Sequence, residues 1–447
     1  MKKLTTLLLG LLLPIGLCAQ EDWKALTRYE KAPIKKQLAD RLMGYVKFDT
    51  QSKVSGKVPS TSGQLQLAKA LAKELKKNGA TNVKVDKFGL VTAEIPSNLG
   101  KPAPTVAFVT HLDSAPGFAS QNIRPQLHNY KGSDIVINAA QGLTLNSYNA
   151  PQLLRAKGHD IITASGNTIL GADGKAGAAI LLTATQYFYD HPQLPHGTIK
   201  LVFSPDSYTG TGIRHLDTAA LGADFAYTLD AGEMGQLVDE TFSAKTFKAV
   251  FEGNRSVNIG KAASLPFADN VLMASDFHTL LPRTKRPETT AYKNGFIYVS
   301  DIVTQGNRTE VTGILRAFSE QEMDVLTQEV SRAFSTVKSL NPKGKNFSLT
   351  FGNQDKNLQQ AIPALSLRKA EEAMRAEEIT PVRTASRTTT DGARLAEKGL
   401  PAPGLSTGYY NNPGTLEYAD VDAMEAALRM LMRLVSVWSV QEAAPVQ

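Results

Sequence analysis

The sequence contains very little cysteine. Among 447 residues there is one, Cys18, and it lies at the end of an N-terminal apolar run. Cleavage of this run as a signal peptide after Ala19 would leave a mature chain with no thiol and no disulfide. Thiolate catalysis and cysteine-based zinc sites are therefore excluded for that mature chain.

The sequence also lacks a concentrated charge of either sign. The formal net charge is +7, but the basic residues are interspersed with acidic ones and form no single block. Binding to nucleic acid or to a membrane surface therefore receives little support. There is no internal repeat and no low-complexity tract, and a length of 447 residues allows two or three globular domains.

The first twenty residues, MKKLTTLLLGLLLPIGLCAQ, join a basic start to an apolar run that is too short to span a membrane comfortably. This pattern is typical of a secretory signal peptide, which we expect to comprise residues 1–19. Lipid anchoring at Cys18 is the alternative, although Leu17 fits poorly the small residue expected before a lipidated cysteine. We expect a secreted or periplasmic protein without a membrane span.

The segment TILGADGKAGA, residues 168–178, leads from a short apolar run into the start of a helix and contains one carboxylate, Asp173. Its glycines allow a tight backbone, and the AAILLTATQYF sequence that overlaps its end has apolar residues at helical spacing. Such strand-to-helix junctions hold ligands and metals in α/β sheets. Asp173 either caps the helix or binds a metal, and the spacing leaves both alternatives open.

Two other strand ends carry residues of a similar kind. The buried-looking strand PTVAFVT leads directly into His111 and Asp113, and a later strand ends at Asp230. The His-x-Asp pair is either part of a surface loop or a metal-binding imidazole whose second nitrogen is held by a carboxylate. Together, His111, Asp173 and Asp230 are three residues of the types that bind zinc, which favours a metal site.

The sequence pattern changes near residue 244. Strands and helices alternate before this point, whereas long alternating segments such as GFIYVSDIVTQG dominate afterwards. We therefore expect an α/β domain of residues 22–243 and 342–441, interrupted by an α+β domain of residues 244–341.

Eight motifs follow one another along the mature chain: YVKFDTQSK, THLDSAP, LGADGKAG, FSPDSYTGTG, YTLDAGEMG, RPETT, RTTTDGARL and GLPAPGLSTGYYN. In order and spacing they resemble peptidase T, the tripeptide aminopeptidase branch of the two-zinc exopeptidases. The resemblance implies a hydrolase that acts on short peptides. It also implies a zinc-exopeptidase catalytic domain, with a mixed sheet flanked by helices, and an inserted lid domain that often mediates dimers.

The resemblance also assigns roles to individual residues. It implies that His111, Asp173 and Asp230 bind the first zinc, that Asp173 bridges to the second, and that Asp113 orients the imidazole. Arg316 and Arg387 match arginines thought to bind substrate, and a planar guanidinium suits a peptide carboxylate. The alternative for both arginines is a surface position without a role in binding.

The other residues expected at the second zinc are missing. The family's PDEE motif reads PDSY at residues 205–208, so Ser207 stands in place of the general base and Tyr208 in place of a zinc-binding glutamate. The HEF-like motif reads LEY, with Leu416 in place of the histidine, and no histidine follows His278. A serine hydroxyl cannot hold a proton near neutral pH as a general base must.

The lid motif that carries an oxyanion-stabilising histidine in the family corresponds to SVNIG, residues 256–260, and lacks that histidine. We therefore expect a pseudoenzyme that binds at most one zinc ion, or none, and retains a site for short peptides. The alternative is an active tripeptide aminopeptidase with one zinc and with Asp206 or Glu417 as a substitute base. Loss of a general base typically costs ~10²- to 10⁴-fold in rate, which favours the first interpretation.

Overall fold

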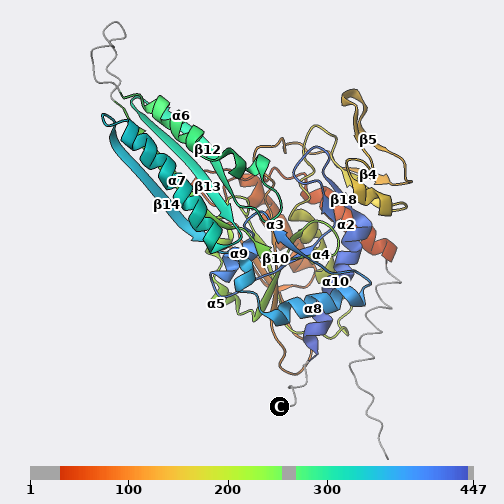
Figure 1. Ribbon diagram of the computed structural model, residues 1–447. Coiled ribbons are helices and arrows are strands. Elements are labelled where there is room, and N and C mark those ends of the chain that lie inside the picture. The colour runs from red at the N-terminus through yellow and green to blue at the C-terminus, as the bar shows by residue number, and fades with distance from the viewer. Residues whose placement is uncertain (1–30, 254–267, 441–447) are drawn as a thin grey trace, which may run out of the picture.

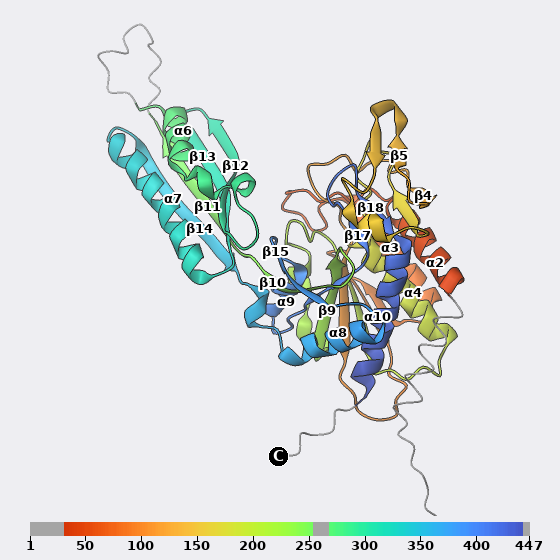
Figure 2. The same ribbon diagram turned by 45° about the vertical axis from the view of Figure 1, so that its right-hand side comes forward.

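The computed structural model describes residues 31–253 and 268–440 of the chain. In both views the chain forms a larger α/β part, from which an elongated second sheet with its own helices extends (Figure 1, Figure 2). The expected signal peptide, Cys18 and the motif at residues 256–260 lie outside the described residues.

The larger part is built on a mixed eight-stranded sheet with the strand order β1-β2-β8-β3-β9-β16-β10-β15. The strands are β1 Thr81–Val85, β2 Val91–Ile95, β8 Ile199–Ser204, β3 Val106–His111, β9 Phe225–Ala231, β16 Gly404–Ser406, β10 Gln236–Thr241 and β15 Val382–Ser386. The central strands β8, β3 and β9 are parallel, and every residue of β3 is buried, as expected for a strand covered on both faces.

Helices cover both faces of this sheet. One face packs against α2 Lys31–Tyr45, α3 Ser62–Lys77, α4 Lys175–Asp190, α8 Ala364–Ala376 and α10 Val421–Ser439. The other packs against the short helices α5 Thr218–Leu221 and α9 Asp391–Ala396. A mixed sheet flanked by helices was expected from the sequence, and this fold class is confirmed.

Smaller elements complete the larger part. A four-stranded sheet has the order β17-β18-β7-β4, and β5 and β6 form a separate hairpin. Their bounds are β17 Tyr409–Tyr410, β18 Tyr418–Asp420, β7 Asp160–Thr163, β4 Gln126–Asn129, β5 Ile135–Asn138 and β6 Leu143–Leu145. Among the described residues, the 3₁₀ helices are η1 Ala139–Gln141, η2 Pro151–Arg155, η3 Ile213–His215, η5 Arg283–Lys285, η6 Pro287–Thr289 and η7 Leu358–Gln360.

The second sheet is four-stranded and antiparallel, in the order β12-β13-β11-β14. It consists of β11 Ser243–Glu252, β12 Phe296–Gln305, β13 Arg308–Ala317 and β14 Lys345–Asp355, and it packs against α6 Asn270–Leu280 and α7 Glu320–Leu340. We call this unit the lid. The apolar stripe of α7, including Leu326, Val330 and Phe334, is buried in the lid's core.

One expected boundary was wrong. The sequence pattern predicted that the chain returns to the first domain at residue 342, but β14 pairs with β11 in the second sheet. Its alternating residues place Phe351 opposite Phe247, so the strand completes the lid's apolar face. The lid therefore continues to Asp355 before the chain returns to the larger part.

None of the described helices is both long and apolar enough to cross a membrane.

Candidate active site

The parallel strands bring the predicted site residues to one edge of the sheet. His111 is the last residue of β3, Asp230 lies near the end of β9, and Ser207 and Tyr208 follow the end of β8. Asp173 lies two residues before α4. This edge, formed by the carboxyl ends of the strands, is where open α/β sheets place their ligands.

The His111 ring lies between two carboxylates. Its Nδ1 is 3.1 Å from Asp113 Oδ1, and its Nε2 is 3.1 Å from Asp173 Oδ1. Burial alone would lower the pKa of His111, but the charge of Asp173 and the hydrogen bond with Asp113 raise it well above its ordinary value. The expected contact in which Asp113 orients the imidazole is present in this geometry.

The second oxygen of Asp173 accepts two hydrogen bonds from neutral donors. The Tyr208 hydroxyl is 2.6 Å from Asp173 Oδ2, and the Asn412 side-chain nitrogen is 2.8 Å from the same atom. Asn412 Nδ2 also lies 3.1 Å from the Tyr208 oxygen, which closes a triangle. Asn412 was not predicted as a site residue, although it lies directly after the GLPAPGLSTGYYN motif.

Asp230 is turned toward its own strand. Its Oδ1 accepts a hydrogen bond from Thr228 Oγ1 at 2.6 Å, and burial raises the pKa of Asp230 to about 6. In the described part of the chain, one group of three histidine or acidic side chains has ligand atoms within 4.8 Å of one another, and it does not include Asp230. The structure thus joins His111 with Asp173 but does not join the complete set of predicted first-zinc ligands.

The turn that follows β8 is fixed by its neighbours. The backbone nitrogens of Ser207 and Tyr208 donate to the two oxygens of Asp113, at 3.1 and 3.0 Å. The carbonyl oxygen of Ser207 accepts a hydrogen bond from Arg394 Nη1 at 3.1 Å. Asp113 therefore holds this turn in addition to the imidazole, and the Ser207 position carries no acid or base.

The two residues considered as substitute bases are both buried. Asp206 accepts hydrogen bonds from the backbone nitrogen of Ser60 at 2.6 Å and from Gln64 Nε2 at 2.8 Å. Glu417 accepts from the backbone nitrogens of Gly171 and Ala172, at 2.8 and 2.7 Å. Burial raises the pKa of Glu417 to about 7. Both oxygens of each carboxylate are already engaged in holding loops of the fold.

The two predicted substrate arginines lie at the junction with the lid. Arg387 donates to the backbone carbonyls of Tyr292 and Asn294, at 2.6 and 3.2 Å. Arg316 donates to the carbonyl of Arg387 at 2.9 Å, while its buried Nε has no hydrogen-bond partner. Burial lowers the pKa of Arg316. Arg316 thus retains a free donor, whereas Arg387 is used to connect the two parts.

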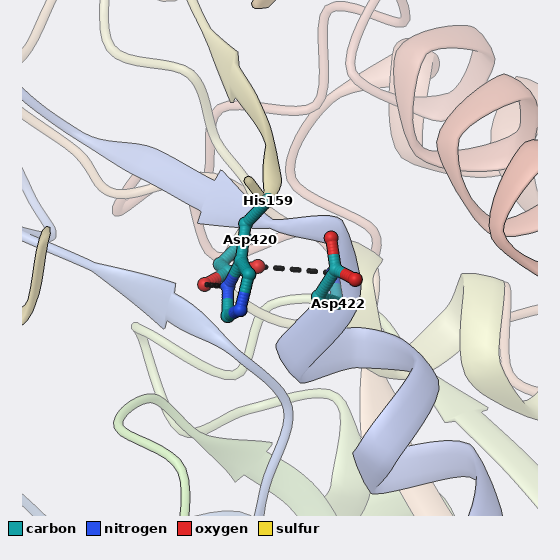
Figure 3. A group of neighbouring side chains, drawn as sticks. All are labelled: His159, Asp420 and Asp422. Atoms are coloured by element: carbon teal, nitrogen blue, oxygen red, sulfur yellow. Dashed lines mark hydrogen bonds and ion pairs between the residues drawn. The ribbon is translucent and has the colours of Figure 1, made fainter. Parts of the chain in front are cut away.

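The three clustered side chains identified above are His159, Asp420 and Asp422 (Figure 3). His159 Nδ1 is 2.7 Å from Asp420 Oδ2, and Asp420 Oδ1 accepts from backbone nitrogens at the start of α10. Lys35 Nζ lies 2.8 Å from Asp422 Oδ2. Because a lysine and a helix N-terminus already satisfy these acidic groups, they fit a structural ion-pair network better than a cation site.

Comparisons with known proteins identify the class. Residues 168–437 match the Peptidase family M20/M25/M40, and the chain belongs to this family of peptidases. Within it, the chain is similar to Peptidase T of Clostridium botulinum (strain Loch Maree / Type A3), with 36% identity over 410 residues that cover 90% of this chain and 99% of the relative. Peptidase T of Clostridium perfringens (strain SM101 / Type A) is also 36% identical over 408 residues, with the same coverage of both chains.

Solved structures share the fold. The aminopeptidase PepT from Bacillus cereus ATCC 10987 has a TM-score of 0.67 and 18% identity, and it covers 91% of this chain and 99% of its own. A tripeptidase from Staphylococcus aureus subsp. aureus Mu50 has a TM-score of 0.70, with the same identity and coverage. The resemblance to peptidase T that the motifs indicated is therefore confirmed.

One relative is described as binding two metals. The Bacillus subtilis YXEP protein, a dinuclear metal-binding peptidase of the M20 family, has a TM-score of 0.60 and 13% identity, and it covers 91% of this chain and 98% of its own. The present chain differs from the family motifs at positions 207, 208 and 416. Ser207, Tyr208 and Leu416 offer neither a carboxylate nor an imidazole, and hydrogen-bond donors face Asp173 Oδ2.

Proposed function

We propose that this protein is a peptidase-T-like homologue with impaired hydrolytic activity, which binds at most one zinc ion and retains a site for short peptides. The observation that carries the proposal is the Tyr208 hydroxyl at 2.6 Å from Asp173, beside a serine at the general-base position. Asp206 and Glu417 do not replace that base, because both are buried and hydrogen-bonded on both oxygens.

A single ion would be held by His111 and Asp173, with Asp230 as the third ligand after its side chain leaves Thr228. A bound zinc acts as a Lewis acid and acidifies a bound water. The residues of this chain supply the imidazole orientation through Asp113, but they supply no free carboxylate at the Ser207 position to accept a proton.

For the peptide, the unpartnered Nε of Arg316 supports a role in binding a carboxylate.

For the quaternary structure, we propose a homodimer through the lid. The edge strand β12 has Tyr298, Ile302 and Val303 about half exposed, which is consistent with pairing to a second copy.

We further propose that residues 1–19 are removed and that the mature protein is secreted or periplasmic. The basic pair, the short apolar run and Ala19 before the cleavage point support this. Expression in a secreting host, followed by N-terminal sequencing and intact mass, tests it. A mature chain that begins at Gln20 is expected, whereas a diacylglycerol-modified Cys18 or a retained leader would contradict it.

The proposed function is tested by tripeptide hydrolysis together with elemental analysis of the same purified sample. The Peptidase T of Clostridium botulinum serves as the positive control. We expect a rate at least ~10²-fold below the control, since a general base contributes typically ~10² to 10⁴, and no more than one zinc per chain. A rate comparable with the control would instead establish the active aminopeptidase that the sequence left as the alternative.

A further inference from the structure

We infer that the Tyr208 hydroxyl and the Asn412 amide occupy the position of a second metal ion, so that Asp173 is a hydrogen-bond acceptor and not a bridging ligand. This rests on the proposed function of the site and deepens it. It states what replaces the ion, and it predicts that the site is complete without one.

Two hydrogen-bond donors face Asp173. Tyr208 and Asn412 both lie within 2.8 Å of Oδ2, while Oδ1 faces His111 Nε2 at 3.1 Å. An amide NH₂ group has hydrogens and no acceptor lone pair to offer a cation. The opposite orientation of the amide would place its oxygen against the carboxylate, so the charge of Asp173 selects the donating orientation. Asp173 Oδ2 therefore accepts hydrogen bonds from both side chains.

Hydrogen bonds hold the backbone of the turn that carries Tyr208. Its nitrogen donates to Asp113, and the preceding carbonyl accepts from Arg394, whose Nη1 also lies 3.1 Å from Asp391. The Tyr208 ring meets the His111 ring edge-on, with 5.6 Å between centroids. A cation approaching Oδ2 would have to displace the Tyr208 hydroxyl from Asp173.

The two donors also contact each other. Asn412 Nδ2 lies 3.1 Å from the Tyr208 oxygen as well as 2.8 Å from Asp173. Asn412 comes from the loop between β17 and β18, whereas Tyr208 comes from the turn after β8. Two segments far apart in the sequence thus meet at one carboxylate oxygen. A divalent ion would link the same segments, and here hydrogen bonds link them.

The test measures thermal stability of the full mature chain in EDTA and in ZnCl₂, with zinc stoichiometry in parallel. For the wild type we expect at most one zinc per chain, and zinc added beyond one equivalent should leave the melting temperature unchanged to within about 1 °C, because an ion that does not bind does not stabilise the folded state. Tyr208→Phe should lower the melting temperature in EDTA by about 2–6 °C, because a charge-assisted hydrogen bond is lost. Tyr148→Phe is the matched control, since this tyrosine is 94% exposed, and it should cause no shift.

Asn412→Asp provides a second variant that does not depend on a lost hydroxyl. It places a second carboxylate beside Asp173, so the variant should be less stable than the wild type in EDTA. Two zinc ions in the wild type would overturn the inference. So would a Tyr208→Phe variant or an Asn412→Asp variant with wild-type stability in EDTA. Rapid tripeptide hydrolysis by a wild type with these expected metal properties would contradict the proposed function and leave this inference standing.

Discussion

Arg387 Nη1 donates to the backbone carbonyl oxygen of Tyr292 at 2.6 Å. The same guanidinium lies over the rings of Phe242 and Phe296, at 5.1 and 5.4 Å from their centroids. Tyr292 belongs to the loop that leads into β12 of the lid, whereas Arg387 follows β15 of the main sheet. An arginine that the sequence associated with substrate therefore connects the lid to the larger part.

Replacing Arg387 should loosen this connection. Arg387→Ala removes charge-assisted hydrogen bonds to lid carbonyls, so we expect a loss of about 2 kcal/mol in stability and faster hydrogen exchange at residues 290–295. Arg383→Ala is the matched control. Arg383 forms half-exposed ion pairs with Glu371 and Asp239, and their loss should cost less than about 1 kcal/mol. Unchanged exchange at 290–295 in Arg387→Ala would show that the arginine does not hold the lid.

Helix α4 packs closely against the sheet at Gly177, so a larger residue there should destabilise the protein. A Cβ atom added at Gly177 would lie 2.2 Å from the carbonyl oxygen of Leu229 and 2.6 Å from Thr110 Oγ1. Gly177→Ala should therefore push α4 away from β9 and cost about 1–3 kcal/mol. At Gly44 in α2 nothing lies within 4 Å of an added Cβ, so Gly44→Ala should gain up to about 1 kcal/mol from helix propensity. A urea unfolding midpoint that falls for Gly177→Ala and rises for Gly44→Ala would confirm this prediction.

The ion-pair network at the start of α10 makes stability depend on pH. The hydrogen bond with Asp420 raises the pKa of His159, with support from the charges of Asp420 and Asp422 and opposition from burial and Lys35. Because the pKa in the folded state is raised, this contribution is fully present below the ordinary pKa of histidine, about 6.5, and is lost as pH rises through the raised value. His159 is partly exposed, so we expect less than about 1 kcal/mol.

The measurement compares melting temperatures of the wild type and His159→Gln at pH 5.5 and pH 8.5. The wild type should be the more stable protein at the lower pH, and the difference should shrink at the higher pH. His128→Gln is a control of opposite sign, because burial lowers the pKa of His128 and its neutral form favours the folded state at the higher pH. A difference between wild type and His159→Gln that is independent of pH would contradict the prediction.

The sequence predicted the parts of the site that depend on strand ends. An apolar run precedes His111 and Asp113, and a glycine-containing junction surrounds Asp173. Such local patterns predict where a parallel strand ends, and therefore which residues lie at the carboxyl edge of the sheet. The fold class followed from the same alternation. The order of motifs then placed the chain within its family before any contact was known.

The contacts that distinguish this site could not be predicted in the same way. Asn412 meets Asp173 across 239 positions of sequence, and no periodicity relates the two residues. The role of Arg387 depends on how close the lid loop comes, which its motif does not encode. The assignment of β14 failed for a similar reason, because its alternating pattern suits either sheet and the pairing with β11 decides between them.

Introducing the family's metal-binding and base residues at positions 207, 208 and 416 tests the proposed impairment of the site. The triple variant Ser207→Glu, Tyr208→Glu and Leu416→His should bind more zinc than the wild type and recover some tripeptide cleavage. The turn that carries the first two positions is held by Asp113, so the new carboxylates would extend from a fixed backbone. Ser207→Glu alone should change little, because a base needs a metal-acidified water to deprotonate. Leu416 is partly buried against an apolar cluster, so an imidazole there must leave that cluster to reach the ion. A folded triple variant with unchanged zinc content would mean that this rearrangement does not occur, and that the pocket has been remodelled beyond these three side chains.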